Sequence, residues 1–277
     1  MKIGNFRLEQ LSEGIFEISS GGAIQKVRDH QATKPAVPSV ERVGLDPVLI
    51  DTGNTLVMLD AGLGMGLDNS EPDRNTSNLL TNLDVLGYRP EDISHVILSH
   101  LHYDHVAGLS HTSQNGNIAA SLPNARIYVQ KEEWNTAMRS LSDPQKNREA
   151  GYDPDDLYRL VADDRFVFLE KERQEILKGL TIIRTGGHTP GHQVVRIRDK
   201  KETAYFCGDL IPSEFYLNHH VLSKVDMDTT KARKARILLM QEAHRDQATL
   251  LFYHSVYHKA GKVTMDKHRK FVLRTKQ

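Results

Sequence analysis

Four side chains that bind metal ions in proteins lie within six residues, in the segment His100-Leu101-His102-Tyr103-Asp104-His105. The segment follows residues 93–98, a short apolar run that is typical of a buried strand. Imidazole and carboxylate groups are ligands of zinc, and also of iron, manganese and cobalt. A turn at the end of a strand is a rigid place for such side chains to converge. The pattern therefore favours a transition-metal site over a loop of solvated histidines.

Four ligands from one loop cannot close two metal sites, so further ligands are expected at other strand ends. Three candidates each follow an apolar run in the same way. They are His188 after residues 180–184, Asp209 after residues 204–207, and His254 after residues 250–253. One such residue alone would be weak support, but three in this order predict a shared metal centre.

The elements that must position these residues follow from hydrophobic periodicity. Residues 5–18 alternate as two strands with a turn at Glu13-Gly14, and the polar residues 19–42 predict a long loop. Further strands are expected at residues 43–50, 56–59, 93–98, 125–129, 166–169, 180–184, 194–197, 204–207 and 250–253, the last being the final strand. Helices are expected at residues 79–86, with Gly87 as C-cap, and at residues 131–139 and 230–244. Clusters of strands interleaved with single helices predict an α/β or α+β sandwich.

Composition narrows the class of protein. The chain has 277 residues, 36 basic and 36 acidic side chains, one cysteine and 14 histidines. Zero formal charge argues against a nucleic-acid partner, and the basic run at residues 231–236 is expected to be the solvated face of a helix. A single cysteine excludes an intramolecular disulfide framework and fits a reducing compartment. With no apolar stretch long enough to span a bilayer and no leader pattern, we expect a cytoplasmic protein without a membrane partner.

The ordered set of motifs resembles the metallo-β-lactamase superfamily over nearly the whole chain. The segments that carry the resemblance are Leu59-Asp60-Ala61-Gly62, His100 to His105, His188-Thr189-Pro190-Gly191-His192, Gly208-Asp209 and His254. The resemblance implies a four-layer αββα sandwich with the metals at one edge between two sheets. It also implies a single domain over residues 1–277.

The resemblance further implies a ligand set for two divalent transition-metal ions. The first metal would be held by His100, His102 and His188, the second by Asp104, His105 and His254, and Asp209 would bridge both. Zinc is expected first, with cobalt, manganese and iron as alternatives. Asp60 is expected to orient a ligand histidine, because ligating imidazoles usually donate their other N–H to a carboxylate or carbonyl. His192 is interpreted as a supporting histidine rather than a ligand.

Within the superfamily the chain looks most like the quorum-quenching N-acyl-homoserine lactonases and the related organophosphate hydrolases. The family's β-lactamases usually carry cysteine or serine near the position of Asp209, so lactam hydrolysis is not expected. Several of the lactonases place a tyrosine three residues after the bridging aspartate, where this chain has Pro212. The pocket walls are expected from residues 21–42, 64–75 and 210–220, with Phe215 and Tyr216 as candidate lining residues.

The resemblance therefore implies a dinuclear hydrolase that opens a lactone ring through a metal-bridging hydroxide. Asp104 would act in catalysis as well as in ligation, by orienting the hydroxide and passing a proton to the leaving alkoxide. A phosphotriester or aryl ester hydrolase is the alternative, and a phosphodiesterase or nuclease is a weaker one. The expected partner is a small neutral ester or lactone substrate, and a homodimer is left open.

Overall fold

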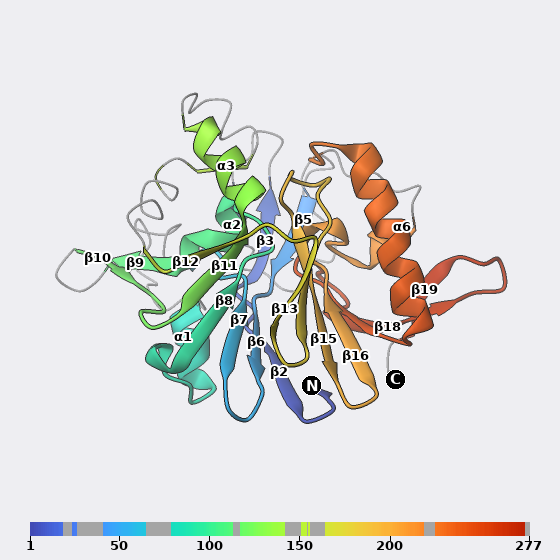
Figure 1. Cartoon of the computed structure of the whole chain (residues 1–277), viewed down its shortest axis with the longest axis horizontal. Helices are drawn as coiled ribbons and strands as arrows, with labels where there is room; N and C mark the ends of the chain where they lie inside the picture. The colour runs from blue at the N-terminus through green and yellow to red at the C-terminus, as the bar shows by residue number, and fades with distance from the viewer. Residues whose placement is uncertain are drawn as a thin grey trace.

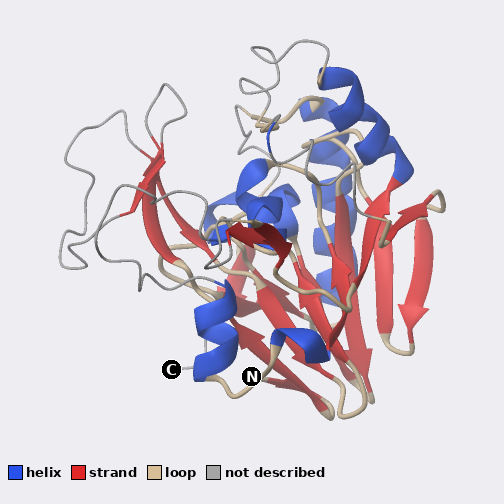
Figure 2. Ribbon diagram, turned by 90° about the vertical axis from the view of Figure 1, so that its left-hand side faces the viewer, coloured by secondary structure: helices blue, strands red, loops and turns tan. Residues whose placement is uncertain are grey.

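The computed structural model describes residues 1–18, 24–26, 41–64, 79–112, 117–141, 151–153, 155, 164–218 and 225–274. Two seven-stranded sheets pack face to face, and helices cover their outer faces (Figure 1, Figure 2). In Figure 1, α1 (Leu79–Val85) and α3 (Lys131–Ser140) lie beside the first sheet, and α6 (Thr229–Arg245) lies beside the second. This architecture confirms the predicted four-layer αββα sandwich.

The first sheet has the strand order β1-β2-β6-β7-β8-β11-β12. Its strands are β1 (Lys2–Ile3), β2 (Phe6–Gln10), β6 (Val48–Asp51), β7 (Leu56–Leu59), β8 (Ile93–Ile97), β11 (Arg126–Gln130) and β12 (Phe166–Leu169). Strands β7, β8, β11 and β12 run parallel to one another. The segments that follow β7 and β8 therefore leave the sheet at the same edge, which brings Asp60 and the His100 segment together.

The second sheet has the order β13-β14-β15-β16-β17-β18-β19. Its strands are β13 (Arg173–Leu177), β14 (Leu180–Arg184), β15 (Gln193–Asp199), β16 (Glu202–Phe206), β17 (Thr249–Leu251), β18 (Ala260–Met265) and β19 (Phe271–Arg274). Strand β16 is parallel to β17, and β14 and β16 each pair antiparallel with β15. Strands β14, β16 and β17 therefore all end at one edge, where His188, Asp209 and His254 follow them.

Three apolar clusters fill the spaces between the four layers. Successive residues of one strand enter different clusters: Val48 and Ile50 of β6 lie between the sheets, while Leu49 packs toward α1 and α3. On the far side, Ala232 and Met240 of α6 pack against the second sheet. Burial on both faces explains why the central strands are continuous apolar runs instead of alternating ones.

The prediction of one strand at residues 43–50 is wrong, because these residues belong to two strands, β5 (Glu41–Leu45) and β6. Strand β5 pairs with β3 (Gly14–Ile18) and belongs to a separate three-stranded sheet with β4 (Ile24–Lys26). The strand is interrupted at Asp46 and Pro47, because Pro47 has no backbone N–H to donate to a neighbouring strand. The Asp46 carboxylate is buried and accepts a hydrogen bond from the Lys259 ammonium at 2.5 Å.

The predicted ends of the polar loop and of the last strand are also corrected. Residues 19–42 were predicted to be a loop, but β4 and the first two residues of β5 lie within them. Residues 19–23 and 27–40 lie outside the described residues. Residues 250–253 are not the last strand, since β18 and β19 extend the second sheet. These two strands were not predicted from the sequence, and neither were β1, β4, β13 and the short pair β9 (Ser110–Thr112) and β10 (Ile118–Ala120).

The helix predictions are confirmed. Gly87 has a φ of +76° just after α1, and the next N–H, of Tyr88, donates to the Leu83 carbonyl, as in a glycine C-cap. Among the described residues, no helix combines the length and the apolar composition needed to cross a membrane.

Candidate metal centre

The segment after β8 delivers four ligand-type side chains into the protein. His100 and His102 lie in the loop, and Asp104 and His105 lie on α2 (Tyr103–Val106), a single helical turn that His102 precedes. All four residues are buried. The loop therefore supplies two candidate ligands, and the helical turn after it supplies two more.

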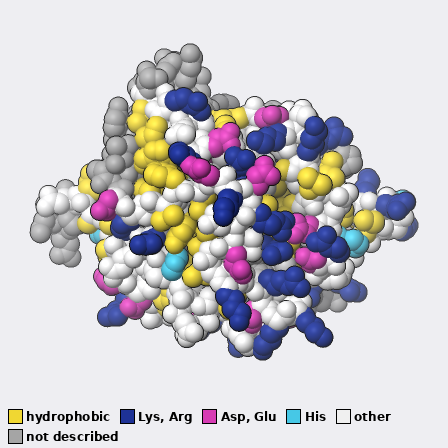
Figure 3. All heavy atoms as spheres, viewed as in Figure 1, with side chains coloured by type: hydrophobic (Ala, Val, Ile, Leu, Met, Phe, Trp, Pro, Cys, Tyr) yellow, Lys and Arg dark blue, Asp and Glu magenta, His cyan; other side chains and the backbone are white. Residues whose placement is uncertain are grey.

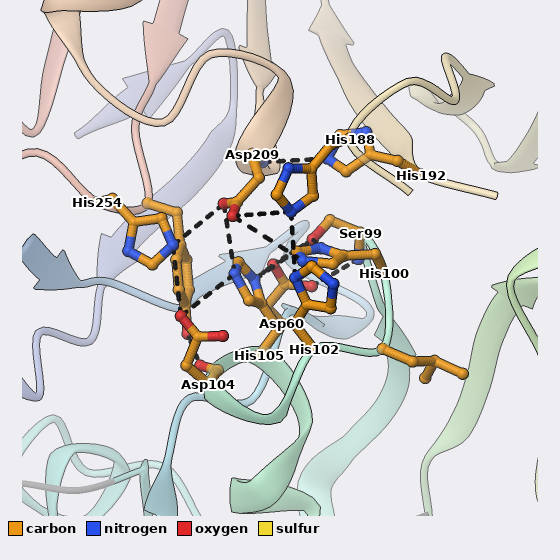
Figure 4. A network of polar contacts seen from close by, with 12 residues as sticks. Asp60, Ser99, His100, His102, Asp104, His105, His188, His192, Asp209 and His254 are labelled. Atoms are coloured by element: carbon orange, nitrogen blue, oxygen red, sulfur yellow. Dashed lines mark hydrogen bonds and ion pairs between the residues drawn. The ribbon is translucent and has the colours of Figure 1, made fainter. Parts of the chain in front are cut away.

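A first cluster joins ligands from both sheets. His100, His102, His188 and Asp209 can each offer one ligand atom, and these atoms lie within 4.8 Å of one another. The His188 Nε2 atom lies 3.1 Å from His102 Nδ1 and 3.2 Å from Asp209 Oδ2 (Figure 4). The His100 Nε2 atom lies 3.9 Å from the same Asp209 oxygen.

A second cluster contains Asp104, His105 and His254. The Nε2 atoms of His105 and His254 lie 3.8 Å and 3.4 Å from Asp104 Oδ2. The other carboxylate oxygen of Asp209, Oδ1, lies 3.3 Å from His105 Nε2 and 3.1 Å from His254 Nε2. Asp209 therefore presents one oxygen to each cluster (Figure 4).

The outer nitrogens of four histidines indicate that these clusters fit metal ions. The Nδ1 atoms of His105, His188 and His254 face acceptors, namely Asp60 Oδ2 at 2.7 Å, Asp226 Oδ1 at 3.2 Å and the Gly44 carbonyl at 3.0 Å. His100 Nδ1 lies 3.0 Å from the Ser99 hydroxyl. Donation from Nδ1 leaves the Nε2 lone pair facing the cluster, as in histidines that ligate metals.

Two of these inner nitrogens are otherwise unsatisfied. The buried Nε2 atoms of His100 and His105 lie 3.9 Å and 3.3 Å from the Asp209 oxygens, but neither makes a hydrogen bond of good geometry among the described residues. A buried polar atom without a partner is costly, whereas imidazole nitrogen and carboxylate oxygen are the ligands that zinc and similar ions take. The donor set and its burial therefore suit divalent metal ions.

The electrostatics of the first cluster point the same way. Burial, together with the neighbouring imidazoles, holds the pKa of His100 and of His102 well below the usual value, which favours the neutral form. Burial would raise the pKa of Asp209, but His254, His105 and His188 outweigh it and hold that pKa well below its usual value. Neutral histidines and an ionised aspartate are the forms that bind metal. In the second cluster burial would lower the pKa of His105 and of His254, but the carboxylates of Asp104 and Asp209 outweigh it and raise both, which favours positive charge there.

Asp60 was expected from the sequence to orient a ligand histidine, and it contacts His105. It accepts the Ser99 backbone N–H at 2.6 Å and the Ser99 hydroxyl at 2.7 Å, in addition to its contact with His105. Asp60 has a φ of +56°, a left-handed conformation that aspartate tolerates better than most residues. The residue thus fixes both His105 and the start of the ligand segment.

His192 contacts the centre through the backbone of Asp209. Its Nε2 accepts the Asp209 N–H at 3.0 Å, and its Nδ1 lies 2.7 Å from the Thr185 hydroxyl. Both ring nitrogens are therefore occupied by groups that are not candidate ligand atoms, a backbone N–H and a hydroxyl. This placement suits a supporting histidine.

Several residues at the centre were missed by the sequence analysis. Asp226 contacts His188, Glu133 contacts the loops that carry ligands, and the Tyr152 ring meets the His102 ring edge-on at 5.0 Å. Arg236 was expected on a solvated helix face, but its side chain is 1% exposed and its Nε donates to the Leu210 carbonyl. Only tertiary contacts reveal these roles, because none of these residues stands at a strand end in an apolar pattern.

The two candidate pocket residues have different surroundings. Phe215 is 63% exposed, and its ring meets the Tyr257 ring edge-on at 6.4 Å. Tyr216 packs against the cluster beneath α6, with the Arg236 guanidinium 5.5 Å from its ring centre. Of the walls expected around the pocket, residues 21–23, 27–40, 65–75 and 219–220 lie outside the described residues.

A family profile described as Metallo-beta-lactamase superfamily matches residues 46–243. The chain belongs to this superfamily. Its fold and its two ligand clusters are those expected of a metal-binding member of that class.

Curated relatives include an N-acyl homoserine lactonase from Bacillus sp, 27% identical over 190 residues that cover 62% of this chain and 66% of the relative. Another, from Bacillus cereus, is 30% identical over 138 residues that cover 48% of this chain and 42% of the relative. The chain thus spans less than two thirds of the length of these relatives.

Solved structures match over the whole chain. A probable metal-dependent hydrolase from Staphylococcus aureus aligns with a TM-score of 0.78 and 25% identity, covering all of both chains. AidC, a dizinc quorum-quenching lactonase, aligns with a TM-score of 0.77 and 19% identity over all of this chain and 97% of the other. The second likeness shows the fold alone.

Proposed function

We propose that this chain is a dinuclear hydrolase that opens the ring of a lactone of the N-acyl-homoserine type. The observation that carries the two-metal part is Asp209, whose Oδ2 faces the first cluster and whose Oδ1 faces the second. The lactone part draws on the relatives described as N-acyl homoserine lactonases. It also draws on the absence of a net charge that would suit a polyanion.

The proposed ligands divide by the contacts described above. His100, His102 and His188 hold the first ion, Asp104, His105 and His254 hold the second, and Asp209 joins the two. Zinc is the proposed metal, because nitrogen and carboxylate donors in a buried site suit it well. When bound, the ions make water nucleophilic near neutral pH and polarise the carbonyl oxygen that receives negative charge.

The reaction requires one proton to move. The oxygen of water adds to the ester carbonyl carbon, the ring C–O bond breaks, and the proton that water loses ends on the leaving oxygen. Asp104 is the proposed carrier, because its carboxylate lies at the second cluster. Its backbone carbonyl accepts the Tyr253 hydroxyl at 2.6 Å, which fixes the residue.

The face of the molecule drawn in Figure 3 fits a small neutral substrate better than a nucleic acid. On the face drawn in Figure 3, Lys and Arg side chains are spread widely with Asp and Glu among them. Nucleic-acid binding draws most of its affinity from basic side chains that neutralise phosphates. A neutral ester or lactone needs no such surface.

The test combines metal analysis with a substrate panel. Purified protein supplied with zinc should hold about two ions per chain, as seven ligands sharing one bridge predict. It should open acyl-homoserine lactones and simple aliphatic lactones with release of one proton per ring, because the carboxylic acid product ionises near neutral pH, and a chelator should abolish this activity.

Phosphotriesters, nitrophenyl esters, β-lactams and a phosphodiester complete the panel. Efficient turnover of one of these with no lactone opened would overturn the substrate assignment. One ion or fewer after zinc supplementation would overturn the dinuclear assignment.

A further inference from the structure

Glu133 is a buried acid that the proposed reaction does not use. It lies in the first turn of α3, next to Glu132, which has the same side chain. Their environments differ completely: the Glu132 side chain is 42% exposed and pairs with Arg184, whereas Glu133 is 0% exposed. A carboxyl group is buried in this way only when its hydrogen bonds compensate for lost water.

Three donors from three separate segments meet the Glu133 carboxylate. Oε1 accepts the Leu101 N–H and the Tyr152 hydroxyl, each at 3.0 Å. Oε2 accepts the Gly191 N–H at 3.1 Å. Each of these partners donates, which favours the ionised carboxylate, but burial outweighs these hydrogen bonds and raises the pKa of Glu133 above its usual value.

Two of these partners, Leu101 and Gly191, belong to segments that carry the first cluster. Leu101 lies between His100 and His102 in the loop after β8. Gly191 lies three residues after His188, in the turn between β14 and β15 of the other sheet. One side chain therefore connects the loop that carries His100 and His102 with the turn that carries His188.

Close packing makes this connection short and rigid. A Cβ atom on Gly191 would lie 2.3 Å from the Glu133 backbone nitrogen, so the turn rests directly on α3. The ring of Tyr152, whose hydroxyl Glu133 binds, contacts the His102 ring. The neighbouring Gly151 also abuts that ring, since its Cβ would lie 2.9 Å from His102 Cδ2.

We infer that Glu133 is a positioning residue that sets the separation between the His100–His102 loop and the His188 turn, and with it the geometry of the first metal site. The inference rests on the proposed ligand set. The hydrogen bonds described for the Glu133 carboxylate go to Leu101, Tyr152 and Gly191, so it acts on the ligands through these residues.

The main test is Glu133→Gln in the full chain, with Glu132→Gln as the matched control. An amide oxygen can still accept from one side, but the NH₂ group cannot accept from the remaining N–H, so one half of the connection is lost. Zinc affinity is measured by competition with a chromophoric chelator, and ligand geometry by the visible spectrum of the cobalt-substituted protein.

We expect Glu133→Gln to weaken one of the two zinc-binding steps by about 10–100-fold and to change the cobalt spectrum. Glu132→Gln should leave both unchanged. Wild-type affinity and spectrum in Glu133→Gln would overturn the inference, as would equal weakening of both steps with an unchanged spectrum, which indicates a general loss of stability.

If Glu133→Gln does not fold, Tyr152→Phe tests the same connection, because it removes one donor and keeps the ring against His102. A smaller change of the same kind supports the inference, and an unchanged cobalt spectrum overturns it. These readouts do not involve lactones. A wild-type protein that binds two ions but opens no lactone refutes the proposed substrate and leaves the Glu133 measurement decisive.

Discussion

Asp209 stands out at the residue scale because its two oxygens face different ligand clusters while His192 holds its backbone N–H. Replacing Asp209 by alanine removes a ligand from both proposed sites. Replacing His192 removes only a support, for which a loss of about 10–100-fold is typical. We expect Asp209→Ala to lose activity well beyond that range and to lose at least one bound ion.

Both variants should be compared at matched metal loading, with folding checked by circular dichroism. If His192→Ala lost metal while Asp209→Ala kept two ions, the ligand assignment in the turn at residues 188–192 would be wrong.

Asp60 offers a test in which the shape of the residue is kept. Asp60→Asn retains an oxygen acceptor and tolerates the positive φ, but it removes the negative charge beside His105 Nδ1. We expect zinc affinity to fall by about 10–100-fold and the melting temperature to fall as well, because the amide NH₂ cannot accept from the Ser99 hydroxyl and His105 Nδ1 as Asp60 Oδ2 does. Chelator competition and calorimetry measure the two quantities, and an unchanged affinity would refute the orienting role of Asp60.

At the scale of elements, the start of α6 packs against the turn that carries His188. The Asp228 side chain caps the helix by accepting the Lys231 N–H, and the Asp228 N–H donates to the Gly187 carbonyl. A Cβ on Gly187 would lie 2.3 Å from the Ala232 nitrogen, so the contact is possible only with glycine. The helix thereby fixes the position of His188.

Gly187→Ala should therefore be far more harmful than Gly53→Ala. Both glycines have a φ near +90°, but a Cβ on Gly53 would meet nothing within 4 Å. Backbone strain of about 1–3 kcal/mol is expected in each variant, and only Gly187→Ala adds a backbone clash. Denaturant unfolding measures the free energies, and zinc binding should fall only in Gly187→Ala. Equal losses in the two variants would contradict this explanation.

The elements also show which part of the fold sequence patterns can reveal. The apolar runs at β8, β16 and β17 were recognisable because they are buried on both faces, and the ligands follow them directly. Strands β13 and β18 mix polar and apolar residues, so their patterns are weak. The break at Asp46-Pro47 lies inside an apolar run, where only the pairing of β5 with β3 shows that a new strand begins.

The same reasoning explains which site residues could be predicted. Histidines and aspartates at strand ends carry a signal in their type and spacing. Glu133 carries none, since Lys131-Glu132-Glu133-Trp134 reads as an ordinary helix start. Its partners lie 32 and 58 residues away along the chain, so only the packing of the two sheets shows its role.

For the whole molecule, bound metal is expected to stabilise the folded state. An ion that binds only the folded chain adds about 2.7 kcal/mol at a free concentration of 100 Kd. For a chain of this size each kcal/mol raises the melting temperature by roughly 2–4 °C. We expect a chelator to lower the melting temperature by several degrees and added zinc to restore it, as measured by scanning calorimetry. A melting temperature independent of zinc would contradict specific binding at these clusters.

The distribution of the ligands along the chain also has a kinetic consequence. His100 and His102 leave the first sheet, whereas His188, Asp209 and His254 leave the second, so neither half holds a complete ligand set. Contacts between residues so distant in sequence require closure of long loops and form slowly during folding. A metal-sensitive dye present during refolding should therefore report zinc uptake in the slowest phase, when the two sheets dock. Zinc uptake would then report the docking of the two sheets, a tertiary step that a probe of secondary structure does not detect.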